Sequence, residues 1–202
     1  MHYLIRHHKL PGSTKAERLK NLWLKIKEFY NANNVSSRLP TLTLGMIYKE
    51  KTGVPKLRAK AAESRGLVKF SKIIAEELLD ENDPFEATLI SCACEIEKAY
   101  ECLHDYDAQR LQNASRKFAL LYKALSESTD DRYFRMKPKM HLLMELSLMN
   151  ANPADFWTYR DESVGGEIAL MARRKGGKDT PLAMSRSVIG KFMSQFPMPS
   201  IV

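Results

Sequence analysis

The sequence predicts an all-α fold, an irregular helical bundle of seven to nine helices. Apolar residues recur at three and four positions along most of the chain, which is the spacing of amphipathic helices. Capping residues precede several of these periodic segments, and turn-forming residues follow them. The 202 residues are 44% hydrophobic and include only 9 Gly and 9 Pro, so we expect an ordered core.

The first strong helix is predicted to run from near Thr14 to about Asn31. Thr14 and Glu17 have the spacing of a capping box and follow the breaker pair Pro11-Gly12. One face is apolar, with Leu19, Leu22, Trp23, Ile26, Phe29 and Tyr30. The other face is cationic, with Lys15, Arg18, Lys20, Lys25 and Lys27, and we interpret it as a solvated face or a phosphate-contacting face. Before this helix, residues 3–5 are strand-like.

Two short helices are predicted next, the first capped by Thr41 or Thr43 and the second beginning at Pro55. Such a pair resembles a helix-turn-helix, although few side chains here suit base edges, which favours contact with phosphates over reading of bases. This segment is the most basic of the chain. We predict that nucleic acid is bound here by Lys56, Arg58, Lys60 and Arg65.

The middle of the chain predicts three longer helices. Their expected ranges are residues 67–79, 84–104 and 107–126, and the last two form a helical hairpin with an acidic flank. Cys92, Cys94 and Cys102 lack the spacing of a metal knuckle and are predicted to be buried free thiols.

Charge divides the chain into three regions, which we expect to form one compact domain. Residues 1–79 are a basic helical region, 80–131 an acidic hairpin and 132–202 a basic C-terminal helical region. Counted at slightly different limits, residues 1–72 carry 16 Lys and Arg against 4 Asp and Glu, whereas 73–131 carry 5 against 14. Residues 132–202 carry 11 against 6, so the net charges are +12, −9 and +5. The basic regions can attract polyanions, or the regions can dock on one another.

Residues 132–178 hold most of the candidate chemistry. A helix is predicted to start at Pro138, with Lys137 and Lys139 as cations beside its start. On this helix His141 and Glu145 are four residues apart, a spacing that can orient an imidazole or hold a metal with a third ligand. The predicted cationic loop Arg173, Arg174, Lys175 and Lys178 surrounds two glycines and suits a sugar–phosphate backbone.

Asp161 and Glu162 precede two glycines and could present a carboxylate to a divalent cation. An alternative is a favourable acidic start to a helix. No cofactor is firmly implied, and Mg²⁺ or Mn²⁺ is expected only if the chain is catalytic.

The string of Pro138, Lys139 and His141, followed by Asp161 and Glu162, resembles the C-terminal part of RNase H-like DNA transposases of the Kyakuja-Dileera-Zisupton type. The resemblance covers about a quarter of the chain. It implies that Glu162 is the last metal-binding carboxylate and that the chain is a fragment or relic of a larger transposase. The glycine between the family's two acidic residues is absent here, and no strands carrying the two earlier aspartates are predicted upstream.

Three functions follow as hypotheses. The first is a helical protein that binds nucleic acid, DNA rather than RNA. The second is a non-enzymatic protein–protein interaction module that uses the acidic middle region. The third is a metal-dependent nuclease acting through His141, Glu145, Asp161 and Glu162. No membrane partner is expected, since no apolar run approaches the roughly 18 residues that a membrane span needs. The N-terminus has no apolar core of a signal peptide, and we expect an intracellular protein, nuclear if eukaryotic.

Overall fold

The computed structural model describes residues 1–48, 54–129, 132–149, 151–156, 180, 182–183, 185–187 and 189–190. The chain divides into two compact units, Met1–Phe156 and Trp157–Val202, and nearly all described residues belong to the first. These residues form eight α-helices and two 3₁₀ turns, and their only β pairing is one bridge between Tyr48 and Pro55. The all-α prediction of seven to nine helices is therefore confirmed.

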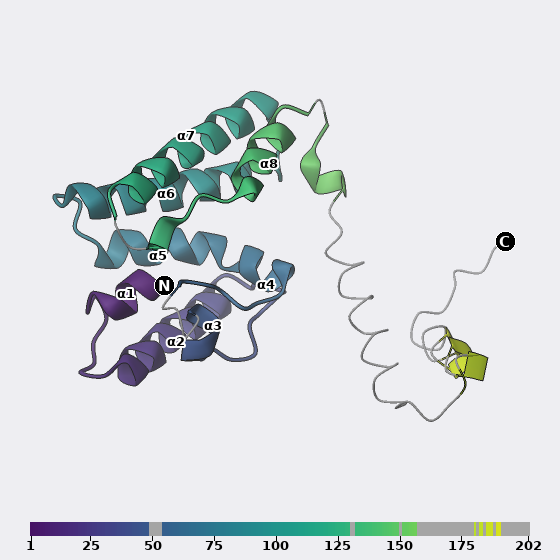
Figure 1. Cartoon of the computed structure of the whole chain (residues 1–202), viewed down its shortest axis with the longest axis horizontal. Helices are drawn as coiled ribbons and strands as arrows, with labels where there is room; N and C mark the ends of the chain where they lie inside the picture. Colours follow the sequence, from purple (N-terminus) through teal and green to yellow (C-terminus); the bar gives the residue numbers. More distant parts are fainter. Residues whose placement is uncertain are drawn as a thin grey trace. The chain divides into compact units, whose positions relative to one another are not determined.

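The eight α-helices and two 3₁₀ turns with named bounds lie in the first unit, and residues 182–183, 185–187 and 189–190 of the second unit are also helical. The α-helices are α1 (His2–Arg6), α2 (Lys15–Ala32), α3 (Leu44–Ile47), α4 (Ala61–Gly66), α5 (Val68–Leu78), α6 (Pro84–Glu101), α7 (Ala108–Glu127) and α8 (Pro138–Ser147). The 3₁₀ turns are η1 (Arg132–Phe134) and η2 (Pro153–Phe156). Helix α5 lies between two groups, with α1–α3 on one side and α6–α8 on the other (Figure 1). None of the helices described combines the length and apolar character that a bilayer span requires.

Capping residues set the helix starts as the sequence predicts. The Thr14 hydroxyl accepts the Glu17 N–H at 3.2 Å, and the Glu17 carboxylate accepts the Thr14 N–H at 3.3 Å. Asp83 and Asp107 cap α6 and α7 through their carboxylates. Pro138 occupies the first turn of α8, where a missing N–H costs nothing.

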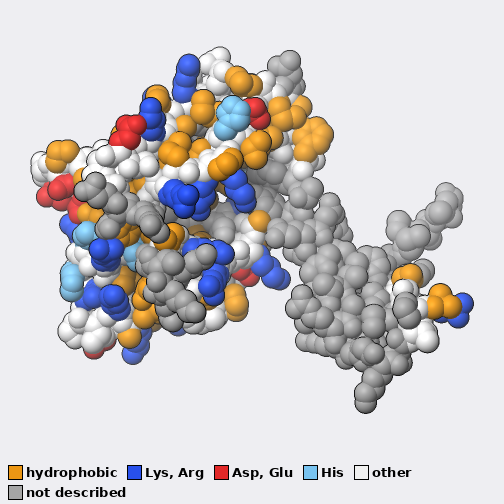
Figure 2. Space-filling view, viewed as in Figure 1, with side chains coloured by type: hydrophobic (Ala, Val, Ile, Leu, Met, Phe, Trp, Pro, Cys, Tyr) orange, Lys and Arg blue, Asp and Glu red, His pale blue; other side chains and the backbone are white. Residues whose placement is uncertain are grey.

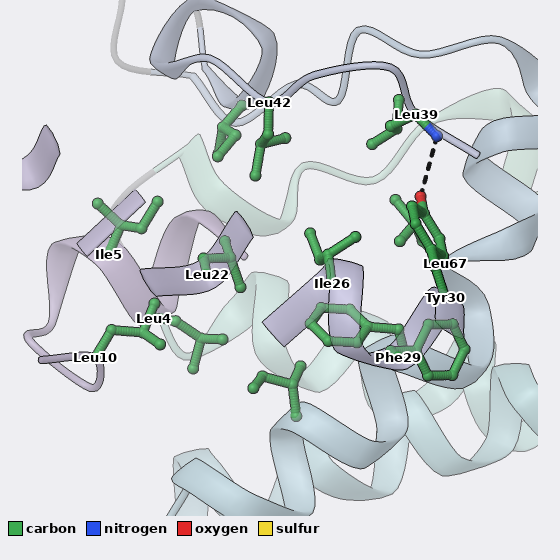
Figure 3. Packing of buried hydrophobic residues seen from close by; sticks show 13 residues of the cluster. Leu4, Ile5, Leu10, Leu22, Ile26, Phe29, Tyr30, Leu39, Leu42 and Leu67 are labelled. Carbon is green, nitrogen blue, oxygen red and sulfur yellow. Dashed lines mark hydrogen bonds between the residues drawn. The ribbon is translucent and has the colours of Figure 1, made fainter. Parts of the chain in front are cut away.

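The main core lies where α2 packs against α1, α3 and α5 (Figure 3). Leu22 and Ile26 are completely buried, and the Phe29 ring lies 5.5 Å from the Phe70 ring. The Tyr30 hydroxyl accepts the backbone N–H of Leu39 at 3.1 Å, which ties the segment after α2 to the core. Each such side chain contributes roughly 1.5–3 kcal/mol through burial. A second cluster of Ala99, Cys102, Leu111 and Ala114 joins α6 to α7, as the predicted hairpin requires.

Arg18 does not lie on the solvated cationic face of α2, where the sequence placed it. Its side chain is only 3% exposed. The guanidinium donates to the backbone oxygens of Ile5 at 2.8 Å, Gly12 at 2.9 Å and Ser13 at 3.1 Å. It therefore holds the α1–α2 connection in place. Backbone carbonyls accept the hydrogen bonds of this buried guanidinium, as a carboxylate would in an ion pair.

Replacing Arg18 with Met is expected to lower the free energy of unfolding by about 2–3 kcal/mol, because the buried carbonyl of Ile5 and the part-buried carbonyls of Gly12 and Ser13 would lose a charged donor. Urea denaturation measures this loss, with Lys20→Met as the control on the exposed side of α2. An equal effect in both variants would contradict the role given to Arg18.

Two further expectations about the N-terminal region are wrong. Residues 3–5 are helical in α1 and not strand-like, because Leu4 and Ile5 both reach the core from one short turn. No helix begins at Pro55, since residues 54–60 are non-helical and α4 starts only at Ala61. A recognition helix at that position is thereby excluded.

Ion pairs join the basic N-terminal region to the acidic region that follows. Lys9 contacts Glu86 at 2.7 Å and Lys72 contacts Glu97 at 3.1 Å. Lys25 pairs with Glu77. The two charge regions therefore dock on one another in part, and several carboxylates of the acidic region are used within the fold.

Candidate nucleic-acid interface

A cleft of about 780 Å³ lies in the first unit, between the N-terminal segments and the chain that leads into α8. Its cations come from two segments that are distant in the sequence, Lys56 from one and Arg135 and Lys137 from the other. Lys56 and Lys137 were both predicted to bind nucleic acid, and the fold brings them to one cleft although 80 residues separate them.

Backbone hydrogen bonds and dihedral angles fix the two segments that carry the cations of the cleft. The Lys56 N–H donates to the oxygen of Ile47 at 2.7 Å, and the Arg58 N–H donates to the oxygen of Met46 at 2.7 Å. These bonds hold residues 54–58 as an extended strip against α3. Lys137 is extended as well, with φ −127° and ψ 150°, because the following Pro138 disfavours helical geometry at that residue.

The cleft is strongly cationic. None of its described lining residues is Asp or Glu. Lys56, Arg135 and Lys137 are exposed and form no ion pair with a carboxylate of the described residues, in contrast to Lys9 and Lys72. Figure 2 shows Lys and Arg side chains gathered across the middle of the face in view. Unpaired cations that converge on one hollow create a positive potential that attracts anions.

The walls of the cleft are aromatic and apolar. His2, Tyr122 and Tyr133 contribute rings, and the apolar lining residues are Ile47, Val54, Pro55, Leu57, Leu67 and Val68. The His2 ring lies 5.1 Å from the Tyr133 ring and 5.1 Å from the Tyr48 ring. Burial lowers the pKa of the His2 imidazole to about 4, and nearby positive charges add to this shift. His2 is therefore neutral at pH 7, and the cations of the cleft are its Lys and Arg side chains.

The other predicted cations lie outside the lining. Arg58, Lys60, Arg65 and Lys139 are exposed, and they flank the lining residues along the chain or lie on α4. They extend the positive surface without entering the cleft. Arg173, Arg174, Lys175 and Lys178 lie outside the described residues, so the predicted basic loop stays a prediction.

Sequence reasoning missed Arg135 and the aromatic lining residues. A signal for Arg135 was present, because residues 135 and 137 place cations two positions apart in the segment before the helix that starts with proline. In an extended chain this spacing directs side chains to one side. No local signal marks Tyr122 or His2, because they reach the cleft only through the packing of α7 and α1.

The candidate catalytic residues are only partly described. His141 Nε2 lies 2.9 Å from Glu145 Oε1, and both side chains are more than half exposed. No group of three or more His, Cys, Asp or Glu residues within the described part could hold a metal ion. Asp161 and Glu162 lie outside the described residues, so the predicted metal ligand stays a prediction.

The nuclease hypothesis predicts that Glu162→Ala abolishes cleavage of a labelled duplex in Mg²⁺ or Mn²⁺. Cleavage measured on a denaturing gel at the wild-type rate would remove Glu162 from the mechanism.

The prediction of buried free thiols is confirmed for two of the three cysteines. Cys92 and Cys102 are buried and Cys94 is half-buried. Burial raises the pKa of the Cys92 thiol to about 12, so it is an unreactive core residue at neutral pH.

The outer side of α8 is apolar. Leu142 and Leu146 of α8, and Met149 just after it, are 53%, 44% and 40% exposed. Helix α8 instead buries Ser147 and half-buries Met140 and Leu143.

Comparisons with models of protein families, with curated proteins and with solved structures return no match.

Proposed function

We propose that this protein binds nucleic acid, with Lys56, Arg135 and Lys137 holding the sugar–phosphate backbone at the cleft. The observation that carries the proposal is the convergence of cations without described carboxylate partners on one hollow, while Lys9, Lys25 and Lys72 are paired within the fold. Lys and Arg that neutralise phosphates release condensed counterions, and this release supplies much of the affinity for a polyanion.

The flanking cations support an extended ligand. Arg58, Lys60 and Lys139 continue the positive surface beyond the cleft and are all exposed. A small anion would use only the cleft, whereas a strand with regularly spaced phosphates would use the flanking side chains too. The resemblance to transposases favours DNA as the polymer. This role would place the protein inside the cell, and in the nucleus if the source is eukaryotic.

The direct test is the salt dependence of binding, measured by fluorescence anisotropy with a labelled oligonucleotide from 50 to 300 mM NaCl. Three or more phosphate contacts predict a slope of log K against log salt of about −2 or steeper. Poly-glutamate of matched charge serves as competitor, and we expect it to compete weakly. A slope near zero would contradict the proposal. Salt-insensitive binding to a protein without nucleic acid would favour the alternative interaction module.

A further inference from the structure

We propose that the cleft takes an unpaired base, so that the protein binds single-stranded nucleic acid in preference to duplex. This inference rests on the proposed nucleic-acid binding and names the class of polymer that the same site would accept. The observation behind it is that the cleft combines cations with a wall that phosphate binding alone does not need.

The volume of the cleft suits a single nucleoside. A volume of about 780 Å³ falls within the range of pockets that enclose small organic ligands. A nucleoside fits such a volume, whereas a double helix cannot enter it. In a duplex the bases are stacked and paired inside the helix, so only a base that is already unpaired, or is extruded at an energetic cost, can reach the cleft.

The apolar and aromatic side chains that line the cleft suit the faces of a base. Val54, Pro55, Leu57 and Val68 are apolar residues of the lining, and Tyr122 adds an aromatic ring to it. The Tyr122 ring is held edge-on against the Phe134 ring at 5.7 Å and 78°, which limits its rotation. A base has two apolar faces, and bases lie readily against aromatic and apolar side chains without sequence preference.

Polar groups in the cleft suit the edges of a base. The Ser71 hydroxyl donates to the oxygen of Val68 at 2.6 Å, so its own oxygen remains available as an acceptor. Ser64 contributes a second hydroxyl to the lining. Lys56, Arg135 and Lys137 all line the cleft, so phosphates next to an inserted base would have cationic partners.

Duplex binding does not account for this lining. Phosphates of a double helix would contact the cations from outside and leave the apolar wall in contact with water. A single strand can place phosphates on the cations and a base against the wall at the same time. The arrangement matches how single-strand-binding proteins combine a basic groove with base-stacking surfaces.

The experiment compares the affinity of the full chain for a 12-nucleotide single strand with its affinity for the same sequence as a blunt duplex, at one salt concentration. We expect the single strand to bind at least 10-fold more tightly. Both DNA and RNA single strands are measured, and so is a free mononucleotide, which has the same chemistry without a polymer. Mononucleotide binding as tight as that of the 12-mer would overturn the polymer assignment.

Two variants test the wall. Tyr122→Leu is expected to weaken single-strand binding about 10-fold and to leave duplex binding unchanged. Leu57→Ala, at a position that is 36% exposed, tests the same wall with less risk to folding. The matched controls are Tyr106→Leu and Leu24→Ala, which change exposed side chains outside the cleft.

The outcomes separate the two proposals. If neither single strand nor duplex binds, nucleic-acid binding itself is wrong. If both bind equally, and neither Tyr122→Leu nor Leu57→Ala changes the ratio of affinities, only the inference about an unpaired base is overturned.

Discussion

Replacing Glu86 with Ala is expected to lower the free energy of unfolding by about 3–5 kcal/mol. Glu86 is 4% exposed and accepts three hydrogen bonds, from the Tyr3 hydroxyl at 2.7 Å, from Lys9 Nζ at 2.7 Å and from the Asp80 N–H at 2.8 Å. The carboxylate thus joins α1, the α1–α2 connection and the turn before α6. Its loss would leave a half-buried ammonium, a tyrosine hydroxyl and a backbone N–H without this acceptor.

Urea denaturation at pH 7 measures this effect, and Glu81→Ala is the matched control because Glu81 is exposed on the same turn. Glu86→Gln keeps an acceptor without the charge and should lose less stability than Glu86→Ala. A Glu86→Ala protein as stable as the Glu81→Ala protein would show that the three hydrogen bonds do not support the fold.

The contribution of Glu86 should depend on pH in a defined direction. Burial alone would raise the pKa of the Glu86 carboxyl, but the hydrogen bonds from Asp80, Lys9 and Tyr3 outweigh it, and the pKa lies below its ordinary value. The folded state therefore favours the ionised form, and the contribution is present above the unfolded-state pKa. It is lost as the pH falls through the lowered folded-state pKa. The stability difference between wild type and Glu86→Gln should thus shrink in acid, and a constant difference would contradict this linkage.

The triple substitution Lys56→Gln, Arg135→Gln and Lys137→Gln is expected to weaken nucleic-acid binding roughly 100-fold at 100 mM salt. The variant removes three phosphate partners, so the salt slope should become shallower by about 2. All three side chains are exposed and form no ion pair with a described carboxylate, so the change should leave the fold intact. Fluorescence anisotropy gives the affinity and the slope, and circular dichroism checks the helices.

The control for this variant removes the same charge elsewhere. Lys20→Gln, Arg116→Gln and Lys117→Gln change exposed cations of α2 and α7 that do not line the cleft. Because net charge falls equally, a long-range effect would weaken both triple variants alike. An equal loss of affinity in the two proteins would therefore assign the binding to overall charge and not to the cleft.

Local chemistry made much of the fold predictable. Thr14, Asp83, Asp107 and Pro138 mark helix starts by capping or by a tolerated missing N–H, and these signals act within one turn. The predictions were wrong where tertiary contacts determine whether a side chain is buried. Arg18 has the charge of a surface residue, but the carbonyls that accept its hydrogen bonds belong to α1 and to the connection between α1 and α2.

The cleft could be predicted only in part, for the same reason. Lys56 and Lys137 were identified from local charge, which each segment displays by itself. Their convergence depends on the strip at residues 54–58 pairing with α3 and on the segment before α8 crossing nearby, which is a tertiary property. Tyr122 belongs to a periodic helix and has no local mark of a site.

Lysine acetylation footprinting of the complex tests the central claim most directly. The protein is acetylated briefly with and without saturating oligonucleotide, and mass spectrometry reports the reactivity of each lysine. We expect nucleic acid to protect Lys56 and Lys137 strongly and to leave the reactivity of Lys20 and Lys117 unchanged. Protection of Lys20 and Lys117 with Lys56 and Lys137 still reactive would contradict the assignment of binding to the cleft.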